Sequence, residues 1–277
     1  MKHKEILLAI IILFFYSKIN AQTNTSPTQT VCQGSLLEPY LINPPSAGSS
    51  YAWSITGVGN NITPGSTSSS ITIDWVNPGV YTLSVIETDA DGCVGLPVLL
   101  EVTVDPLPTQ TIANDESACV GGVIPNLTAI GSNVTWYSDA SLNNIVSTTN
   151  ILSTGQTGVG VYTYYVTESL NGCEGPEISV DLEIYNSPSA PSAQDETACF
   201  GTVIPDLTAT GSNVTWYSDA SLTTVLSNNN NLNTNQTNAG SYDYYVTVTD
   251  VNSCESSATT VNLEIYSSPN TGPINHW

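Results

Sequence analysis

The sequence has almost no positive charge. Its 277 residues contain 3 Lys plus Arg against 24 Asp plus Glu, and the only cations are Lys2, Lys4 and Lys18. Nucleic-acid binding and attraction to an anionic membrane both depend on Lys and Arg. A lysine Schiff base and an arginine clamp need the same side chains. The composition therefore excludes nucleic acid and anionic membranes as partners of the chain after Lys18.

Histidine is equally scarce, which limits nucleophilic catalysis. His3 lies near the N-terminus and His276 precedes the last residue, so a Ser–His or Cys–His pair would rest on a terminal segment. Carboxylate pairs of the kind that glycosidases use remain available, but nothing marks two carboxylates as converging. We therefore predict that the protein is not an enzyme and needs no organic cofactor.

The three lysines fall in a segment with the features of a secretory signal. Lys2 and Lys4 precede the apolar run 6–15, and the small residue Ala21 offers a cleavage point. No later run approaches the roughly 20 apolar residues of a membrane span. No cysteine directly follows the signal, as a lipoprotein would require. We predict a signal peptide over residues 1–21 and an exported protein, at the cell surface or extracellular, with the periplasm as the other location.

The rest of the chain repeats. Residues 115–140 and 195–220 are nearly identical, with a period of 80, and residues 27–105 are a more distant copy. Each copy has the order Cys, Trp, Tyr, Cys. The six cysteines are Cys32, Cys93, Cys119, Cys173, Cys199 and Cys254.

An even number of cysteines in an exported chain predicts disulfides. Because each copy owns two, the economical pairing is one bond per copy: 32–93, 119–173 and 199–254. Bonds between two copies are the alternative. A metal site is disfavoured because the chain has no Cys-x-x-Cys motif and no partnering histidine.

The local pattern is typical of strands. Residues 178–184 and 261–265 alternate apolar and polar side chains, which indicates half-buried strands. Asn171-Gly172 suits a tight hairpin turn. We predict an all-β chain of three tandem Ig-like β-sandwiches in an extended rod, each with its Trp in the core. The Gly-x-Tyr unit before the penultimate strand is similar to a tyrosine corner, but Tyr162 precedes Cys173 by eleven residues rather than two. The predicted domains are 27–105, 109–187 and 191–268, followed by a tail over 269–277.

Several motifs resemble a known group. Copies two and three share Ala-Cys-x-Gly, Thr-Trp-Tyr, Tyr-x-Tyr-Tyr-Val-Thr and a Cys-Glu pair, and they resemble the Ig-like repeats of surface proteins of gliding and related Bacteroidota. Copy one, with Tyr51-Ala-Trp53, Pro78-Gly-Val-Tyr81 and Asp91-Gly-Cys93, is similar to the PKD-like domains found beside them. The resemblance implies spacer or adhesive modules exported by the type IX secretion system. The family's sorting domain of about eighty residues is not seen.

The tail is the first candidate site. Pro273, Ile274, His276 and Trp277 form a short segment that ends in tryptophan, and exposed apolar surface of this kind is often used for binding. We predict that it docks the protein to an envelope or surface protein. The alternatives are a frayed terminus and packing against the third copy.

Carboxylates supply the second candidate site. Glu87, Asp89 and Asp91 have the spacing at which a calcium loop begins, although a hairpin turn explains them equally well. Asp115-Glu116 and Asp195-Glu196 recur beside the linkers, where a junction ion would fit.

These features favour a non-catalytic exported interaction or adhesion module. The alternative is a carbohydrate-binding protein or an accessory module of a glycan-degrading system, in which Tyr137 and Tyr217 would stack on sugars. Strand tyrosines are more often core residues or cross-strand partners.

Overall fold

The computed structural model describes residues 27–43, 45–63 and 67–274, and all regular secondary structure in them is β-strand. The all-β prediction is thus confirmed. By internal packing, the chain divides into two compact units. One comprises residues 1–114, 127–152 and 163–180, and the other comprises 115–126, 153–162 and 181–277. The first copy lies wholly in the first unit and the third copy wholly in the second.

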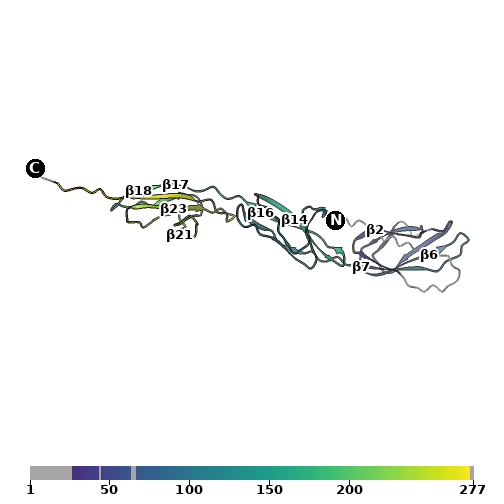
Figure 1. Cartoon of the computed structure of the whole chain (residues 1–277). Helices are drawn as coiled ribbons and strands as arrows, with labels where there is room; N and C mark the ends of the chain where they lie inside the picture. The colour runs from purple at the N-terminus through teal and green to yellow at the C-terminus, as the bar shows by residue number, and fades with distance from the viewer. Residues whose placement is uncertain (1–26, 44, 64–66, 275–277) are drawn as a thin grey trace. The chain divides into compact units, whose positions relative to one another are not determined.

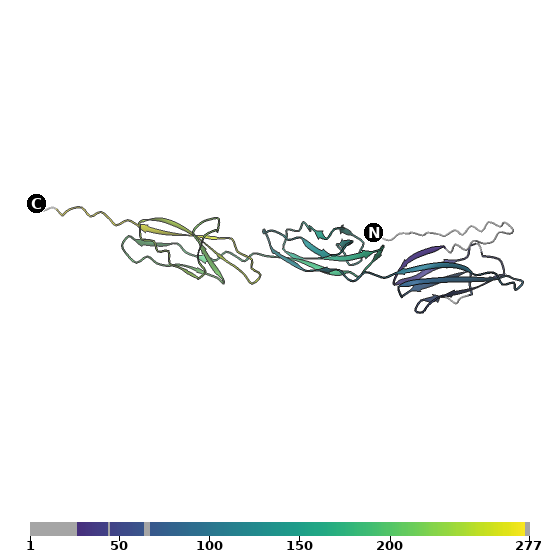
Figure 2. The same ribbon diagram turned by 90° about the horizontal axis from the view of Figure 1, so that it is seen from below.

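The first copy is built from two sheets (Figures 1 and 2). Its strands are β1 (Thr28–Cys32), β2 (Ser35–Leu41), β3 (Ser50–Ile55), β4 (Asn61–Thr63), β5 (Ser70–Trp75), β6 (Gly79–Thr88) and β7 (Val98–Asp105). One sheet has the order β1-β7-β6-β3 and the other β2-β5-β4. β1 pairs parallel with β7, from Thr28 opposite Glu101 to Cys32 opposite Asp105. The chain therefore begins and ends the copy on adjacent parallel strands.

The second copy has one short and one long sheet. Its strands are β8 (Ile112–Ala113), β9 (Glu116–Cys119), β10 (Leu127–Ile130), β11 (Val134–Tyr137), β12 (Ile145–Ser147), β13 (Ile151–Leu152), β14 (Gly160–Leu170), β15 (Cys173–Glu174) and β16 (Ile178–Tyr185). The orders are β13-β10-β8 and β12-β11-β14-β16-β9, with β15 paired to β14. In the turn between β14 and β15, Asn171 and Gly172 have φ of 52° and 86°, as the predicted hairpin requires.

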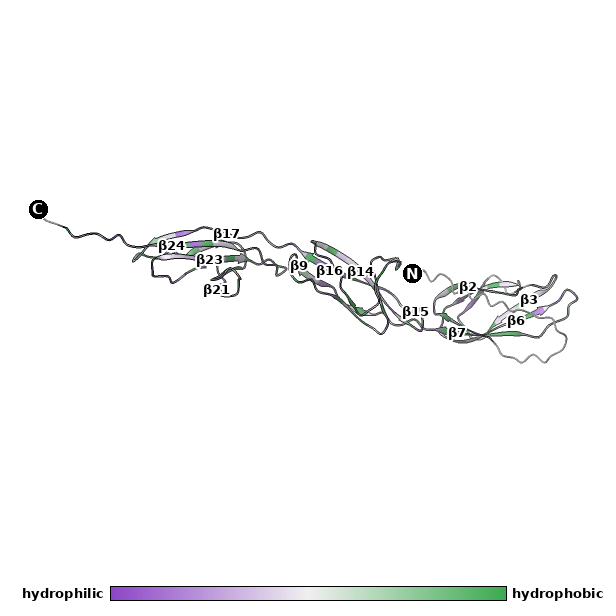
Figure 3. Cartoon of the chain, in the orientation of Figure 1, coloured by the Kyte–Doolittle hydropathy of each residue, from purple (hydrophilic) through white to green (hydrophobic). Residues whose placement is uncertain are grey.

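The third copy repeats the second. Its strands are β17 (Ser192–Ala193), β18 (Glu196–Cys199), β19 (Leu207–Thr210), β20 (Val214–Tyr217), β21 (Val225–Ser227), β22 (Asn231–Leu232), β23 (Gly240–Val248) and β24 (Thr259–Tyr266). The sheets have the orders β17-β19-β22 and β18-β24-β23-β20-β21. Hydrophobic and hydrophilic residues follow one another along β24 (Figure 3), and every second residue of that strand from Val261 to Ile265 is buried. This alternation gives each sheet one apolar face.

A tryptophan lies in the core of each copy, as predicted. Trp53 is 8% exposed, and Trp136 and Trp216 are fully buried. Each indole N–H is satisfied by a backbone carbonyl, that of Ser68 at 2.8 Å in the first copy and those of Thr149 and Asn229 at 3.1 Å in the others. A buried tryptophan needs such a partner, and in the second and third copies the acceptor occupies the same position, 13 residues after the tryptophan.

The predicted tyrosine corner is also present. The hydroxyls of Tyr81, Tyr162 and Tyr242 each donate to the carbonyl of the residue four positions earlier, at 3.1, 3.0 and 3.1 Å. The corner fixes the loop that enters the long strand β6, β14 or β23 of each copy.

The disulfide pairing within copies is wrong. The structure bonds Cys32 to Cys173 and Cys119 to Cys254, and leaves Cys93 and Cys199 free. Each bond therefore joins one copy to the next, which was the alternative pairing, and the expectation of one bond in each domain fails. The reason is the parallel pairing of first and last strands. Cys32, at the end of β1, lies opposite Asp105 at the C-terminal end of β7, whereas Cys93 precedes the N-terminal end of β7. The eight residues of β7 span about 25 Å, which separates the two cysteines.

Candidate functional site

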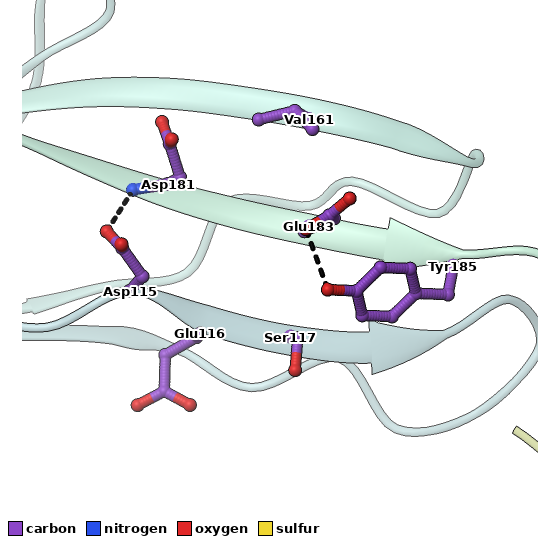
Figure 4. A pocket seen from close by; sticks show the side chains of 7 residues that line it. All are labelled: Asp115, Glu116, Ser117, Val161, Asp181, Glu183 and Tyr185. Atoms are coloured by element: carbon purple, nitrogen blue, oxygen red, sulfur yellow. Dashed lines mark hydrogen bonds between the residues drawn. The ribbon is translucent and has the colours of Figure 1, made fainter. Parts of the chain in front are cut away.

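In the second copy, an open recess lined by carboxylates lies on the sheet with the order β12-β11-β14-β16-β9, and we call it the acidic recess. It has a volume of about 310 Å³. It is lined by Asp115, Glu116, Ser117, Val161, Asp181, Glu183 and Tyr185 (Figure 4). The residues come from β9, β14 and β16 and from Asp115, which directly precedes β9. Four of the seven lining residues carry a carboxylate, and none of the seven is a Lys or Arg.

Two hydrogen bonds organise the acidic recess. Asp115 Oδ1 accepts from the backbone N–H of Asp181 at 2.8 Å, and the hydroxyl of Tyr185 donates to Glu183 Oε2 at 2.7 Å. The bond to Glu183 raises the pKa of Tyr185 above its usual value, because the neutral hydroxyl is the donor. Asp181 Oδ1 is buried without a partner, while the Glu116 carboxylate points away from the others (Figure 4).

The third copy shows that the Asp before the first long strand is a structural brace. Asp195 Oδ1 accepts from the backbone N–H of Asn262 at 2.8 Å, as Asp115 does from Asp181. Asn262 stands where the second copy has Asp181, and its amide donates to Ser241 and Asp243. In the second and third copies the aspartate of the recurring Asp-Glu pair therefore ties the start of β9 or β18 to the last strand, β16 or β24.

In the first copy, the carboxylate of Asp89 stabilises the turn that carries Asp91. Asp89 Oδ1 accepts from the backbone N–H groups of Asp91 at 3.0 Å and Cys93 at 2.8 Å. The nearby hydroxyls of Ser49 and then Ser46 lower the pKa of Glu87. Among the described residues no three His, Cys, Asp or Glu side chains are grouped as a metal ion would require, so Glu87, Asp89 and Asp91 are not brought together in that way.

The tyrosines suggested as sugar platforms are buried. Tyr137 is 4% exposed and Tyr217 is 8% exposed, so neither offers a face to a ligand. Their hydroxyls donate to Glu174 Oε1 at 2.5 Å and Glu255 Oε1 at 2.8 Å. Burial, followed by the bond to Glu174, raises the pKa of Tyr137 to about 12. The stacking role proposed for these two residues is therefore wrong.

Glu174 and Glu255 are structural residues that the sequence analysis did not single out. Each follows the second cysteine of its copy, and each also accepts from a buried threonine, Thr167 at 2.7 Å or Thr247 at 2.6 Å. We call this arrangement the Tyr–Glu–Thr cluster: Tyr137, Glu174 and Thr167 in the second copy and Tyr217, Glu255 and Thr247 in the third. It holds the cysteine-bearing turn against the sheet. The repeated Cys-Glu pair was the available signal.

The tail is only partly described. Pro273 is exposed and Ile274 is fully exposed, whereas His276 and Trp277 lie outside the described residues. The predicted signal over residues 1–21 also lies outside them. Within the described residues no helix is long and apolar enough to span a membrane.

Two family models match the chain. Residues 188–266 match a model described as "Ig-like domain CHU_C associated", and residues 18–95 match a PKD-like domain. These matches support the expected Ig-like domain for the third copy and the expected PKD-like domain for the first. Domains of these kinds are typically non-catalytic surface modules. The comparison with curated proteins found no match.

The comparison with solved structures found matches of low similarity. They include the fibronectin(III)-like modules of CbhA from Clostridium thermocellum (18% identity, 60% of this chain and 100% of that one, TM-score 0.36), mouse cadherin-23 EC22-24 (12%, 88% and 96%, 0.27) and Bacteroides ovatus SGBP-B in complex with a mixed-linkage heptasaccharide (14%, 89% and 69%, 0.25). All three TM-scores are low, so these likenesses assign no function to this chain.

Proposed function

We propose that the protein is an exported, non-catalytic interaction or adhesion module that works at the cell surface or outside the cell. The observation that carries this proposal is the pair of disulfides that join successive copies, Cys32–Cys173 and Cys119–Cys254. Disulfides persist in oxidising compartments outside the cytosol. Bonds between copies serve a chain whose task is to hold several domains together, and an isolated catalytic domain would not need them.

Further support comes from the surface chemistry. After residue 21 the sequence has no Lys or Arg, so partners that bind through phosphate or anionic lipid are excluded. From the resemblance to Bacteroidota surface repeats, we further propose that the type IX system exports the protein. We also propose that the tail docks to an envelope protein, and the exposure of the residues before His276 and Trp277 supports this role.

The experiment compares cells expressing the full chain with cells expressing a form that lacks Asn270–Trp277. A second variant keeps the length of the tail and replaces only Pro273, Ile274, His276 and Trp277 with glycine and serine, so that it tests these side chains separately from tail length. We expect the full chain in the surface fraction and both altered forms in the medium or periplasm. A photo-crosslinker identifies the envelope partner, because the mature chain has no lysine for amine reagents.

Identical fractionation of all three forms would refute the docking role. Location of the full chain in the cytoplasm would refute the whole proposal. Saturable binding on a glycan array would instead favour the carbohydrate-binding alternative, since a spacer should bind no glycan saturably.

A further inference from the structure

The six cysteines follow one bonding rule. We call Cys32, Cys119 and Cys199 the leading cysteines, because each ends the first long strand of its copy, and Cys93, Cys173 and Cys254 the turn cysteines. Both disulfides join the leading cysteine of one copy to the turn cysteine of the next. The rule leaves over one turn cysteine, Cys93, and one leading cysteine, Cys199, and both are exposed free thiols.

The free leading cysteine is held in the same way as the bonded ones. Cys32, Cys119 and Cys199 lie opposite Asp105, Tyr185 and Tyr266 in the parallel pairing of first and last strands. The residue after each cysteine donates its N–H to the carbonyl of that opposite residue, at 2.8, 2.9 and 2.8 Å. Cys199 thus needs no rearrangement to take the position from which Cys119 forms its bond.

The free turn cysteine also matches a bonded one. Asp89 Oδ1 accepts from Cys93 N–H at 2.8 Å, and Asp250 Oδ1 accepts from Cys254 N–H at 2.9 Å. The two aspartate N–H groups donate back to the cysteine carbonyls at 3.0 Å. One isolated bridge follows each turn, Thr88 with Val94 or Thr249 with Glu255. Cys93 is therefore presented on the same turn that presents Cys254.

Exposure distinguishes free positions from bonded ones. Cys173 is 1% exposed and Cys254 is fully buried, whereas Cys93 is exposed. Beside Cys93, Val94 is 71% exposed. Beside Cys199, Phe200 and Tyr266 are about half exposed, while their counterparts Val120 and Tyr185 are partly buried. The free position at Cys199 thus exposes apolar surface that is partly buried at the bonded position of Cys119.

We propose that Cys199 of one chain forms a disulfide with Cys93 of a second copy, so that chains join head to tail by the rule that already joins the copies within a chain. The occupant is a second copy because this chain itself carries both halves of the bond. A heterologous contact of this kind generates rings if the rotation between chains closes and open linear multimers if it does not.

The chemistry needs an oxidant, which we take to be a small disulfide such as oxidised glutathione, RSSR. The Cys93 thiolate attacks RSSR and forms a mixed disulfide while one RS⁻ leaves. The Cys199 thiolate of the second chain then attacks the Cys93 sulfur, and the second RS⁻ leaves. Two protein thiols are oxidised, RSSR is reduced to two RSH, and the two thiol protons end on the released thiols.

The test uses two full-length variants with tags of different size. Cys93→Ser keeps only Cys199 free, and Cys199→Ser keeps only Cys93 free. They are mixed with oxidised glutathione at salt concentrations that screen the repulsion between two acidic chains. We expect the mixed dimer to outnumber both homodimers together, because only the mixed pair presents one leading and one turn cysteine. The unaltered chain should give a ladder of multimers that a reductant collapses.

Peptide mapping with a Glu-specific protease should place the new bond between Cys93 and Cys199. The Cys93→Ser/Cys199→Ser double variant is the matched control and should stay monomeric, with unchanged tryptophan fluorescence because neither thiol is buried. Homodimers in statistical proportion, an internal Cys93–Cys199 bond in the monomer, or no covalent product at high salt would each overturn the proposal. The test is made in vitro, so its failure leaves the proposed surface function unaffected.

Discussion

Replacing Cys32 by serine tests the disulfide pattern directly. In the structure Cys32 is bonded to Cys173 with a Cα–Cα distance of 5.4 Å, so the substitution should release the thiol of Cys173. A bond to Cys93 would instead have to cross the length of β7, about 25 Å at the rise of an extended strand. Disulfides require Cα atoms within about 7 Å. The two pairings therefore predict different released thiols.

The same substitution has a calculable effect on stability. The bond closes a loop with a sequence separation of 141 residues. In the chain-entropy model a loop of this length contributes about 5 kcal/mol to the free energy of unfolding, when the two joined copies unfold together. Denaturant unfolding followed by tryptophan fluorescence should show a loss of that order. Cys93→Ser is the matched control and should leave the midpoint unchanged, because that thiol is free.

The assay counts thiols in the denatured, non-reduced monomer. The unaltered monomer should show two, the Cys93→Ser control one, and Cys32→Ser three. Mapping with a Glu-specific protease then identifies the new thiol. Recovery of Cys93 as the thiol released by Cys32→Ser, or a loss of stability in the Cys93→Ser control, would refute the assignment of bonds between copies.

Four further measurements follow from the structure. Tyr137→Phe should lower the free energy of unfolding by about 1.5 kcal/mol, and a double-mutant cycle with Glu174→Gln should show coupling, since the two side chains share a hydrogen bond; strict additivity would contradict the Tyr–Glu–Thr cluster. The pKa values of Tyr40 and Tyr137 are raised to about 12, mainly by burial, from 10.0. Stability should therefore be intact below pH 10 and fall between pH 10 and 12, where the unfolded tyrosines ionise first; melting temperatures and tyrosinate absorbance that stay flat across this range would argue against it. The mature chain should resist trypsin even when reduced and denatured, because no Lys or Arg follows Lys18; fragments on a gel would show that the signal assignment is wrong. Calcium should not change the melting temperature, because the Asp89 carboxylate is already engaged by two backbone N–H groups; a clear rise would reinstate a calcium loop.

The features that the sequence predicted correctly depend on local pattern. Alternating residues such as Val261, Leu263 and Ile265 identify strands, and a repeat that keeps its tryptophan at a period of 80 identifies the core. The tyrosine corner follows from one Gly-x-Tyr unit in each copy. Each of these signals is read from the sequence alone, as a short motif or as a repeat of one, so no knowledge of the packing of distant strands is needed.

The disulfide pairing failed because it depends on distant strands. Whether Cys32 can reach Cys93 is decided by the parallel pairing of β1 with β7, which separates the two cysteines along that strand. Nothing near either cysteine encodes that pairing. The partner of Tyr137 was missed for a similar reason, since Glu174 is distant in the sequence. The extended rod, the domain boundaries and tail docking remain predictions.

The two disulfides also determine how the chain would respond to a pulling force. The loops they close overlap, so the shortest covalent route from Cys32 to Cys254 crosses both bonds and follows only the backbone between Cys173 and Cys119. That route contains roughly 55 residues, against about 220 for an unbridged chain, and at ~3.5 Å per residue its fully stretched length is about 190 Å instead of nearly 800 Å. Even with every sandwich unravelled, a tether of this design would stop lengthening after a quarter of its contour. An oxidised molecule is thus a short, stiff link, and reduction would turn it into a long, compliant one.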